Sequence, residues 1–344
     1  MIVIARHGYR APFDSYGGYN GGTWTCDLPN SSAPPYLSYN SKIYRRFHVK
    51  LDQNNLFYKP SCSKAELTVQ GQSQHYSLGQ YYRKVLIEDR HFLTNYFNPS
   101  EVSIRSSSPD RCVKSAISFL NGFYPAESPD DIVEIVTGTD DHEALHPRTG
   151  HCPDIDSMWD RWLQSSDYIK RKSEAVPYLR AIDDTVDFSD ENQWLWIGDW
   201  LYTIACCSDD FPSFVNQTQF DYAIGAVEFF TIGFFQYTRG VAGASTMRVV
   251  LDKFEKTISQ EETNKFSLMT GHDVTIVAVL NLLGVDLKEI PPFRSHLAFE
   301  RWEVDGMDYI RVVLNGDVVV DLLKYNEFKV KIAPYLKYCS LSVL

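Results

Sequence analysis

The 344-residue sequence has little positive charge, no long hydrophobic run and no internal repeat. Its formal net charge of −11 argues against nucleic acid or an anionic membrane surface as a partner. The longest apolar run, AIGAVEFFTIGFF, is interrupted by Glu228 and is too short to cross a bilayer, so we expect no membrane insertion. The lack of repeats and of low-complexity segments excludes a repeat architecture.

The apolar composition of the chain suits a packed interior. Hydrophobic residues make up 44% of the chain and aromatic residues 14%, which is ample for a buried core. The length is long for a single core and short for two full domains. We therefore expect one large α/β domain with an inserted subdomain.

Seven cysteines and two glycosylation sequons, at Asn30 (NSS) and Asn216 (NQT), indicate the secretory pathway. These features fit a disulfide-forming compartment (extracellular space, lysosome or Golgi lumen) better than the cytosol. No basic and then apolar leader precedes the first predicted strand, so either the leader was removed or the chain is not exported.

Strands and helices alternate along the chain. IVIA and EVSIRSSS are predicted strands, and a helix follows each, in LTVQGQSQHYSLGQYYRKVLI with Thr68 as N-cap and in PDRCVKSAISFLNGFYP. Residues 14–65 show little periodicity and predict a long excursion. A third strand, loop and helix lie in KFSLMTGHDVTIVAVLNLLGV. HLAFERWEV, DYIRVVLNG and DVVVDLL predict closing strands, with NGD as a hairpin turn.

These elements predict an α/β fold with a central, mostly parallel sheet flanked by helices. We assign residues 1–124 and 245–344 to this catalytic core. Residues 125–244 are mostly helical and rich in tryptophan, and we assign them to an inserted helical cap.

Polar residues at three strand ends predict an anion site. Arg6, His7 and Arg10 follow the first strand, Arg105 lies in the second, and His272 with Asp273 follows the third. Ligands of open α/β sheets bind at the carboxyl ends of strands, so we expect these segments to converge. Several arginine side chains around one point suit a phosphate.

His7 is the candidate nucleophile of this site. Arg6 and Arg10 are fixed cations that keep a nearby imidazole neutral, which leaves one ring nitrogen free to attack phosphorus. The arginines would stabilise the charge on the equatorial oxygens. Asp273 could protonate the leaving alkoxide as a general acid.

These segments resemble the histidine acid phosphatases, the branch of the histidine phosphatase superfamily that includes prostatic-type acid phosphatases and phytases. RHGYRAP is similar to the R-H-G-x-R-x-P signature, IRSSSPDRCVKSA to R-S-T-x-x-x-R-x-x-x-S-A, and TGHDVTI to the H-D motif. The resemblance implies phosphate ligands at Arg6, Arg10, Arg105 and His272, a phosphorylated His7 and a proton donor at Asp273. It implies a small phosphomonoester or phosphorylated glycan as substrate, with no metal and no cofactor.

The resemblance departs from the family pattern at two places, with Ser107 and Cys112 where the pattern has threonine. The excursion and the closing strands look most like the 2-phosphoxylose phosphatase subset. That resemblance implies a Cys26–Cys62 disulfide, and the prostatic-type enzymes imply a Cys152–Cys339 disulfide. Cys112, Cys206 and Cys207 are then an odd set with at least one free thiol.

Two other functions compete with this interpretation. HEALH, from His142 to His146, satisfies the H-E-x-x-H zinc signature, but Pro147 and neighbouring acidic residues leave room for a helix of barely two turns. We therefore predict that HEALH is a loop at the mouth of the site. A catalytically silent relative that binds a phosphorylated ligand would keep the arginines but could dispense with Asp273.

Overall fold

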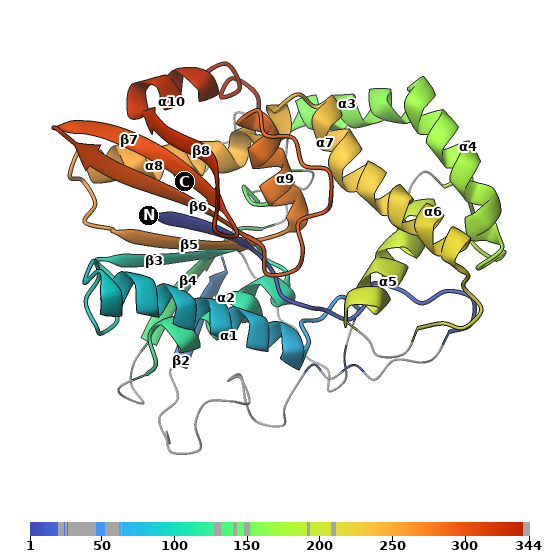
Figure 1. Ribbon diagram of the computed structural model, residues 1–344, viewed down its shortest axis with the longest axis horizontal. Coiled ribbons are helices and arrows are strands. Elements are labelled where there is room, and N and C mark those ends of the chain that lie inside the picture. Colours follow the sequence, from blue (N-terminus) through green and yellow to red (C-terminus); the bar gives the residue numbers. More distant parts are fainter. Residues whose placement is uncertain are drawn as a thin grey trace.

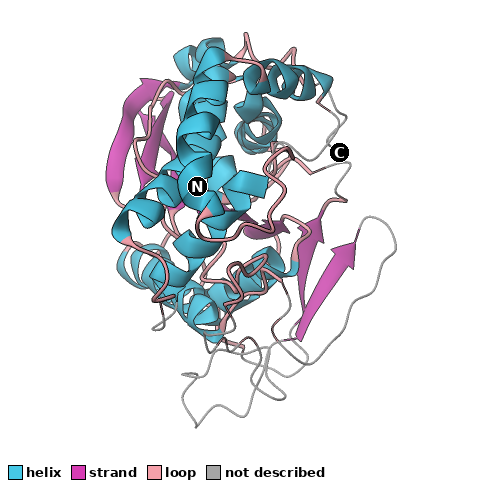
Figure 2. Cartoon of the chain, turned by 90° about the vertical axis from the view of Figure 1, so that its right-hand side faces the viewer, coloured by secondary structure: helices cyan, strands magenta, loops and turns pink. Residues whose placement is uncertain are grey.

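The computed structural model describes most of the chain, namely residues 1–19, 24, 26, 46–51, 62, 64–126, 132–139, 143–147, 152–190, 193–207 and 211–339. Figure 1 shows a sheet with helices on both faces and a group of helices beside it, and Figure 2 looks onto that group. None of the described helices is both long and apolar enough to cross a membrane.

The sheet has eight strands in the order β2-β4-β3-β5-β1-β6-β7-β8. The strands are β1 (Ile2–Arg6), β2 (Arg46–Leu51), β3 (Val102–Ser106), β4 (Ile132–Thr137), β5 (Phe266–Gly271), β6 (His296–Val304), β7 (Met307–Leu314) and β8 (Asp317–Lys324). From β2 to β1 the neighbouring strands are parallel, and from β1 to β8 they are antiparallel. The predicted NGD hairpin joins β7 to β8, with φ of 52° at Asn315 and 103° at Gly316, as tight two-residue turns require.

The helices are α1 (Val69–Arg83), α2 (Asp110–Phe123), α3 (Pro153–Leu163), α4 (Ser166–Arg180), α5 (Gln193–Cys207), α6 (Gln217–Glu228), α7 (Phe234–Tyr237), α8 (Ala244–Ile258), α9 (Asp273–Leu282) and α10 (Tyr325–Ile332). Side chains alternate between the two faces of β1, so Val3 and Ala5 pack with α1 and α2 while Ile2 and Ile4 pack with α8, α9 and α10. The predicted α/β fold is confirmed.

The helices α3 to α7 share a separate aromatic core that includes Trp159, Trp194 and Trp200, and this core extends to α9 through Val277. We refer to residues 153–237 as the helical segment. The predicted cap boundary at residue 125 is wrong in one respect, because β4 pairs with β2 and β3 in the sheet. β2 likewise lies within the predicted excursion. Both are short strands with turn residues around them, so their pattern was weak.

Helix α1 begins against the loop that follows β1. Thr68 is its N-cap, as predicted: the Thr68 hydroxyl accepts from the Gly71 N–H at 3.1 Å and donates to the Tyr9 carbonyl at 3.1 Å. A Cβ on Gly8 would come within 2.4 Å of the Gly71 carbonyl oxygen, and one on Gly71 within 2.2 Å of the Tyr9 oxygen. The glycines therefore permit the close approach that holds the His7 loop in place.

The structure contains both disulfides implied by the resemblance, Cys26–Cys62 and Cys152–Cys339. Cys112 is a buried free thiol, and Cys206 and Cys207 are half-buried free thiols. Cys152–Cys339 joins the start of α3 to the segment after α10. It therefore links the helical segment covalently to the sheet side of the molecule.

Candidate active site

Parallel strands bring the predicted segments together at one edge of the sheet. The register pairs Arg6 of β1 with Gly271 of β5. Backbone hydrogen bonds then tie the following residues, with the His7 N–H donating to the Gly271 carbonyl at 2.9 Å and the Ser107 N–H donating to β5 at 2.8 Å. The His7 and His272 rings consequently lie 5.7 Å apart, edge to face.

The His7 ring is buried and oriented by its own loop. Its Nδ1 lies 2.9 Å from the Gly8 carbonyl oxygen, which can only accept, so Nδ1 carries the proton and Nε2 keeps its lone pair. Burial, followed by the charges of Arg111 and Arg6, lowers the pKa of His7 well below its ordinary 6.5. The imidazole is therefore neutral and able to act as a nucleophile.

Arg6 is held on several sides. One guanidinium nitrogen lies 2.8 Å from a carboxylate oxygen of Asp273, and another donates to the Tyr202 hydroxyl at 3.2 Å and to the Pro291 carbonyl. The guanidinium carbon lies 3.9 Å from the centre of the Phe293 ring. His75, whose role the sequence left open, holds the backbone of Arg6, since its Nε2 lies 2.9 Å from the Arg6 carbonyl.

Arg10 is anchored from the helical segment. It donates to Asp199 of α5 at 2.5 Å, and its guanidinium carbon lies 4.6 Å from the centre of the Phe13 ring. Asp199 and Tyr202 are functional candidates that the sequence analysis missed. They lie on α5, far in the sequence from the other residues of the site, so no local motif marks them as functional.

Arg111 was also missed, although its sequence position could have revealed it. It lies in the first turn of α2, the helix that follows the short loop after β3, where a helix N-terminus favours an anion. It is the largest charged contributor to the lowered pKa of His7. The Nε groups of Arg6, Arg10 and Arg111 are buried with no hydrogen-bond partner in the described part of the chain, as donors to a bound anion would be, and the Nε of Arg105 shares this feature.

The role of Arg105 as a phosphate ligand stays a prediction, and Arg111 is the stronger candidate because its charge, with those of Arg6 and Arg10, acts on both His7 and His272. Residues two apart on a strand share a face, and Ser103 of β3 accepts from Lys253 of α8 at 3.1 Å. Arg105 is on that same face, and its charge acts on Lys253 and Glu143. Arg105 is the penultimate residue of β3, whereas Arg6 is the last residue of β1 and His7, Arg10, Arg111 and His272 follow strand ends.

His272 and Asp273 begin α9, as the predicted strand, loop and helix required. The Nε2 of His272 lies 3.0 Å from the Ser107 hydroxyl, and its pKa is lowered well below 6.5 by burial and by the neighbouring His146 and Arg111. The Asp273 side chain is 22% exposed, and one of its oxygens accepts from the Val274 N–H at 2.7 Å. Solvent can therefore reach this carboxylate.

HEALH is only partly described, because His142 lies outside the described residues. Glu143 to Pro147 form turns and no helix. The His146 ring lies 4.8 Å from the His272 ring, so this loop does reach the site. Within the described ranges, no group of three or more His, Cys, Asp or Glu is placed to hold a metal ion.

Only one of the two predicted glycosylation sites lies in the described part of the chain. Asn216 is exposed, and its side chain caps α6 by accepting from the Gln219 N–H at 3.0 Å. Asn30 lies outside the described residues. Glycosylation at either site stays a prediction.

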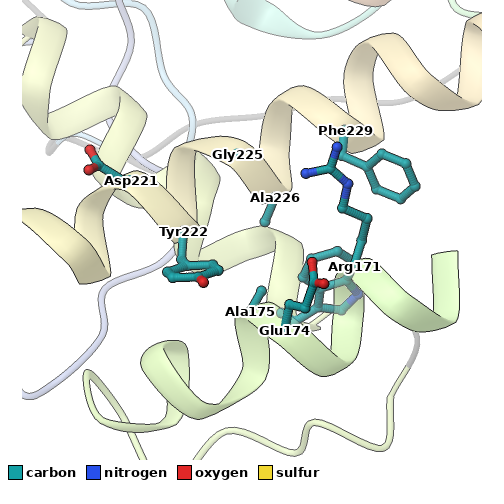
Figure 3. A pocket seen from close by; sticks show the side chains of 9 residues that line it. Arg171, Glu174, Ala175, Asp221, Tyr222, Gly225, Ala226 and Phe229 are labelled. Carbon is teal, nitrogen blue, oxygen red and sulfur yellow. The ribbon is translucent and has the colours of Figure 1, made fainter. Parts of the chain in front are cut away.

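A pocket of about 200 Å³ lies in the helical segment, between α4 and α6. Figure 3 shows Arg171 reaching toward Phe229 above it, with Glu174 and Tyr222 on its other sides. Its lining includes none of the predicted catalytic or phosphate-binding residues.

Comparison with known proteins identifies the family of the chain. Residues 1–315 match the family described as the histidine phosphatase superfamily (branch 2). Counting factor 60 of Dictyostelium discoideum is 22% identical over 99% of this chain and 88% of its own length. Lysophosphatidic acid phosphatase type 6 of Homo sapiens is 24% identical over 88% of this chain and 73% of its own length.

The fold is also similar to that of solved phytases. The Hafnia alvei phytase in complex with tartrate aligns with a TM-score of 0.60 and 13% identity, over 97% of this chain and 96% of the phytase. At this identity the similarity concerns the fold. The narrower resemblance to the 2-phosphoxylose phosphatase subset stays a prediction.

Proposed function

The chain belongs to the histidine phosphatase superfamily (branch 2), and we propose that it hydrolyses phosphomonoesters through a covalent phosphohistidine at His7. Its relatives are named acid phosphatases and phytases, and the chain is a phosphatase of this type. The proposal adds the residue roles and the chemical steps.

The observation that carries the proposal is the state of His7. Its Nδ1 is committed to the Gly8 carbonyl, and Nε2 is the nitrogen with a lone pair. Burial, followed by the charges of Arg111 and Arg6, lowers its pKa well below the ordinary value and so favours the neutral imidazole. A phosphate monoester dianion held by the arginines would place its phosphorus in reach of this nitrogen.

In the first step, Nε2 of His7 attacks phosphorus, the bond to the ester oxygen breaks, and Asp273 delivers its proton to the departing alkoxide. Arg6, Arg10, Arg111 and His272 stabilise the equatorial oxygens. The phosphate competes with Asp273 for Arg6, so substrate binding weakens the ion pair between Arg6 and that carboxylate. In the second step, Asp273 takes a proton from water, which attacks phosphorus and releases phosphate and free His7.

The substrate class is a small phosphomonoester or a phosphorylated glycan. The named relatives act on a lysophosphatidic acid and on phytate, both of which carry accessible phosphomonoesters. Phe13 and Tyr202 stand beside Arg10 and Arg6 and would contact the part of the substrate that leaves. The disulfides support a place in the secretory pathway.

The test is to trap the intermediate. The protein is mixed with a ³²P-labelled monoester and quenched in alkali, which preserves phosphohistidine. We expect label on the wild type and none on His7→Ala, which also loses turnover. His91→Ala is the control and should be labelled, because His91 is exposed and its Nδ1 is hydrogen-bonded to the Ile87 carbonyl. Label that survives on His7→Ala would refute the assignment.

The same preparation separates the two competing functions. A silent phosphate-binding protein would bind vanadate but would not turn over p-nitrophenyl phosphate. A zinc hydrolase would lose activity in excess EDTA and recover it with zinc. We expect turnover that persists in EDTA, because three arginines supply the positive charge near His7.

A further inference from the structure

Helix α5 ends in two adjacent cysteines, Cys206 and Cys207, which take no part in the two disulfides of the fold. Their Sγ atoms lie 2.7 Å apart, although side chains at neighbouring positions of a helix ordinarily point away from each other. Both side chains are half-buried, so a small reagent can reach them. The cysteine pair is therefore a vicinal dithiol, and no step of the proposed mechanism uses it.

The row of α5 residues that faces the active site leads to this cysteine pair. Residues three, four and seven apart share one face of a helix, so Asp199, Tyr202 and Cys206 form one row. Asp199 binds Arg10, and the Tyr202 hydroxyl accepts from Arg6 at 3.2 Å. The charges of both arginines also act on the cysteine pair. The pair consequently lies one helical turn beyond the hydrogen bond that orients Arg6.

A bond between the two sulfur atoms would disturb the last turn of α5. Neighbouring Cα atoms are about 3.8 Å apart, below the roughly 4.4 to 6.8 Å of ordinary disulfides, so the bond is strained and more easily reduced than an ordinary disulfide. The Cys206 thiol donates to the Thr203 carbonyl at 3.4 Å, and oxidation removes that donor. In a helix the Cys206 N–H bonds to the carbonyl four residues earlier, which belongs to Tyr202. Distortion of this turn therefore acts directly on Tyr202.

We propose that Cys206 and Cys207 are a modification site that a small-molecule disulfide oxidises to a vicinal disulfide, and that this oxidation weakens phosphate binding. The effect passes through Tyr202, whose hydrogen bond orients Arg6. Because the strained bond is easily reduced, the state of the pair follows the redox conditions around the protein. The effect on binding rests on the proposed function, in which Arg6 binds phosphate, whereas the thiol chemistry does not.

The oxidation proceeds by two exchange steps. One cysteine thiolate attacks a sulfur of the reagent, the S–S bond of the reagent breaks, and one thiol is released. The second cysteine then attacks the mixed disulfide and releases the second thiol. In total the cysteine pair loses two protons and two electrons, and the reagent gains them.

The experiment equilibrates the purified protein with oxidised or reduced glutathione and measures the disulfide and the activity separately. In the oxidised sample, the peptide that carries Cys206 and Cys207 should resist alkylation and be lighter by two hydrogen atoms. The KM for p-nitrophenyl phosphate should rise by about tenfold, as expected for the loss of one hydrogen bond to a charged group, with kcat less affected. Reduction should restore the original KM.

Three variants locate the effect. The double variant Cys206→Ser/Cys207→Ser cannot form the bond and should keep the KM of the reduced wild type under both conditions. Cys112→Ser is the matched control, because it removes the buried free thiol, and its KM should still respond to oxidation. Tyr202→Phe lacks the hydroxyl that Arg6 contacts, so its KM should be raised from the start and should respond little to oxidation.

Two results would overturn the proposal. One is full alkylation of both cysteines, or a stable mixed disulfide with glutathione, in the oxidised wild type. The other is a vicinal disulfide that leaves KM unchanged, or that raises KM equally in Tyr202→Phe, since a merely structural disturbance would not depend on that hydroxyl. If the double cysteine variant fails to fold, as judged by circular dichroism, the oxidised and reduced wild type and Tyr202→Phe still decide the question.

Failure of the proposed function gives a different result. If the wild type forms no phosphohistidine, the proposed function fails. Peptide mapping still tests the cysteine pair in that case, and binding of vanadate to the reduced and oxidised protein still tests its effect on the anion site. If the wild type is labelled on His7 and oxidation changes neither KM nor vanadate binding, the role of the pair fails while the proposed function stands.

Discussion

The strand-end loops and helix α5 both contribute to the site, but they are held in different ways. His7 and His272 follow parallel strands whose register is set by backbone hydrogen bonds, and Gly8 packs directly on Gly71. Asp199 and Tyr202 belong to a helix that packs through Trp194 and Trp200. Backbone pairing allows little displacement, whereas side-chain packing can adjust.

This difference matches the proposed division of labour. The loops supply the nucleophile, the proton donor and the phosphate ligands, which must be placed closely for reaction. Helix α5 supplies the groups that orient the arginines, through Asp199 to Arg10 and Tyr202 to Arg6. Substitutions in the loops should therefore impair the chemical step, and those on α5 should mainly weaken phosphate binding.

The largest effect is expected for Asp273→Asn, which keeps the shape of the side chain and removes its proton. General acids contribute about 10²- to 10⁴-fold, so kcat should fall about a thousandfold with glycerol phosphate. It should fall far less with p-nitrophenyl phosphate, because that leaving group needs no proton. Steady-state kinetics with both substrates measures this, and equal losses would make Asp273 a positioning residue.

The second effect compares two arginines of one segment. Arg111→Ala removes a donor to the equatorial oxygens and should lower kcat by about 10²- to 10³-fold for both substrates. Arg105→Ala should cost less than about tenfold, because its charge acts on Glu143 and Lys253. Kinetics of the two variants in parallel compares the two candidates, and a larger loss in Arg105→Ala would favour Arg105 as the phosphate ligand.

A smaller effect is expected on α5. Asp199→Asn weakens the anchor of Arg10 and should raise KM about tenfold, equal to about 1.4 kcal/mol, with kcat little changed. Asp221→Asn, on the neighbouring helix α6 and outside the site, is the matched control and should behave as wild type. A fall in kcat with unchanged KM would show that α5 contributes to the chemical step and would contradict the proposed difference between α5 and the loops.

The smallest effect concerns stability in acid. Burial lowers the pKa of His75 to about 3, against 6.5 when exposed, so the folded state must hold it neutral. Above pH 6.5 the neutral ring costs the folded state nothing. As the pH falls from 6.5 toward 3, the unfolded state binds a proton on His75 that the folded state does not, and the free energy of unfolding decreases, by about 2 kcal/mol at pH 5. The free energy of unfolding, measured with urea at pH 8 and at pH 5, should decrease less in His75→Gln than in the wild type, because glutamine does not titrate. An unchanged pH dependence would contradict the assignment.

The sheet, its flanking helices and most of the site could be predicted because their signals are local. The apolar run IVIA predicts a buried strand, and RHGYR directly after it gives the polar residues at the end of that strand. Thr68 likewise predicts the start of α1 as its N-cap. β2 and β4 could not be predicted, because short strands among turn residues owe their structure to the neighbours they pair with.

The sequence by itself determined which loops carry the chemistry: His7 between Arg6 and Arg10, and Asp273 at the start of α9. Tertiary structure favoured Arg111 over Arg105 as the arginine that completes the cluster, since the face taken by Arg105 and the turn that presents Arg111 depend on how β3 and α2 pack. It also brought Asp199, Tyr202 and Glu143 to residues far from them in the chain. Helices and strands depend mainly on residues that are close together in the chain. Ion pairs between distant residues depend on distances that only the folded structure creates.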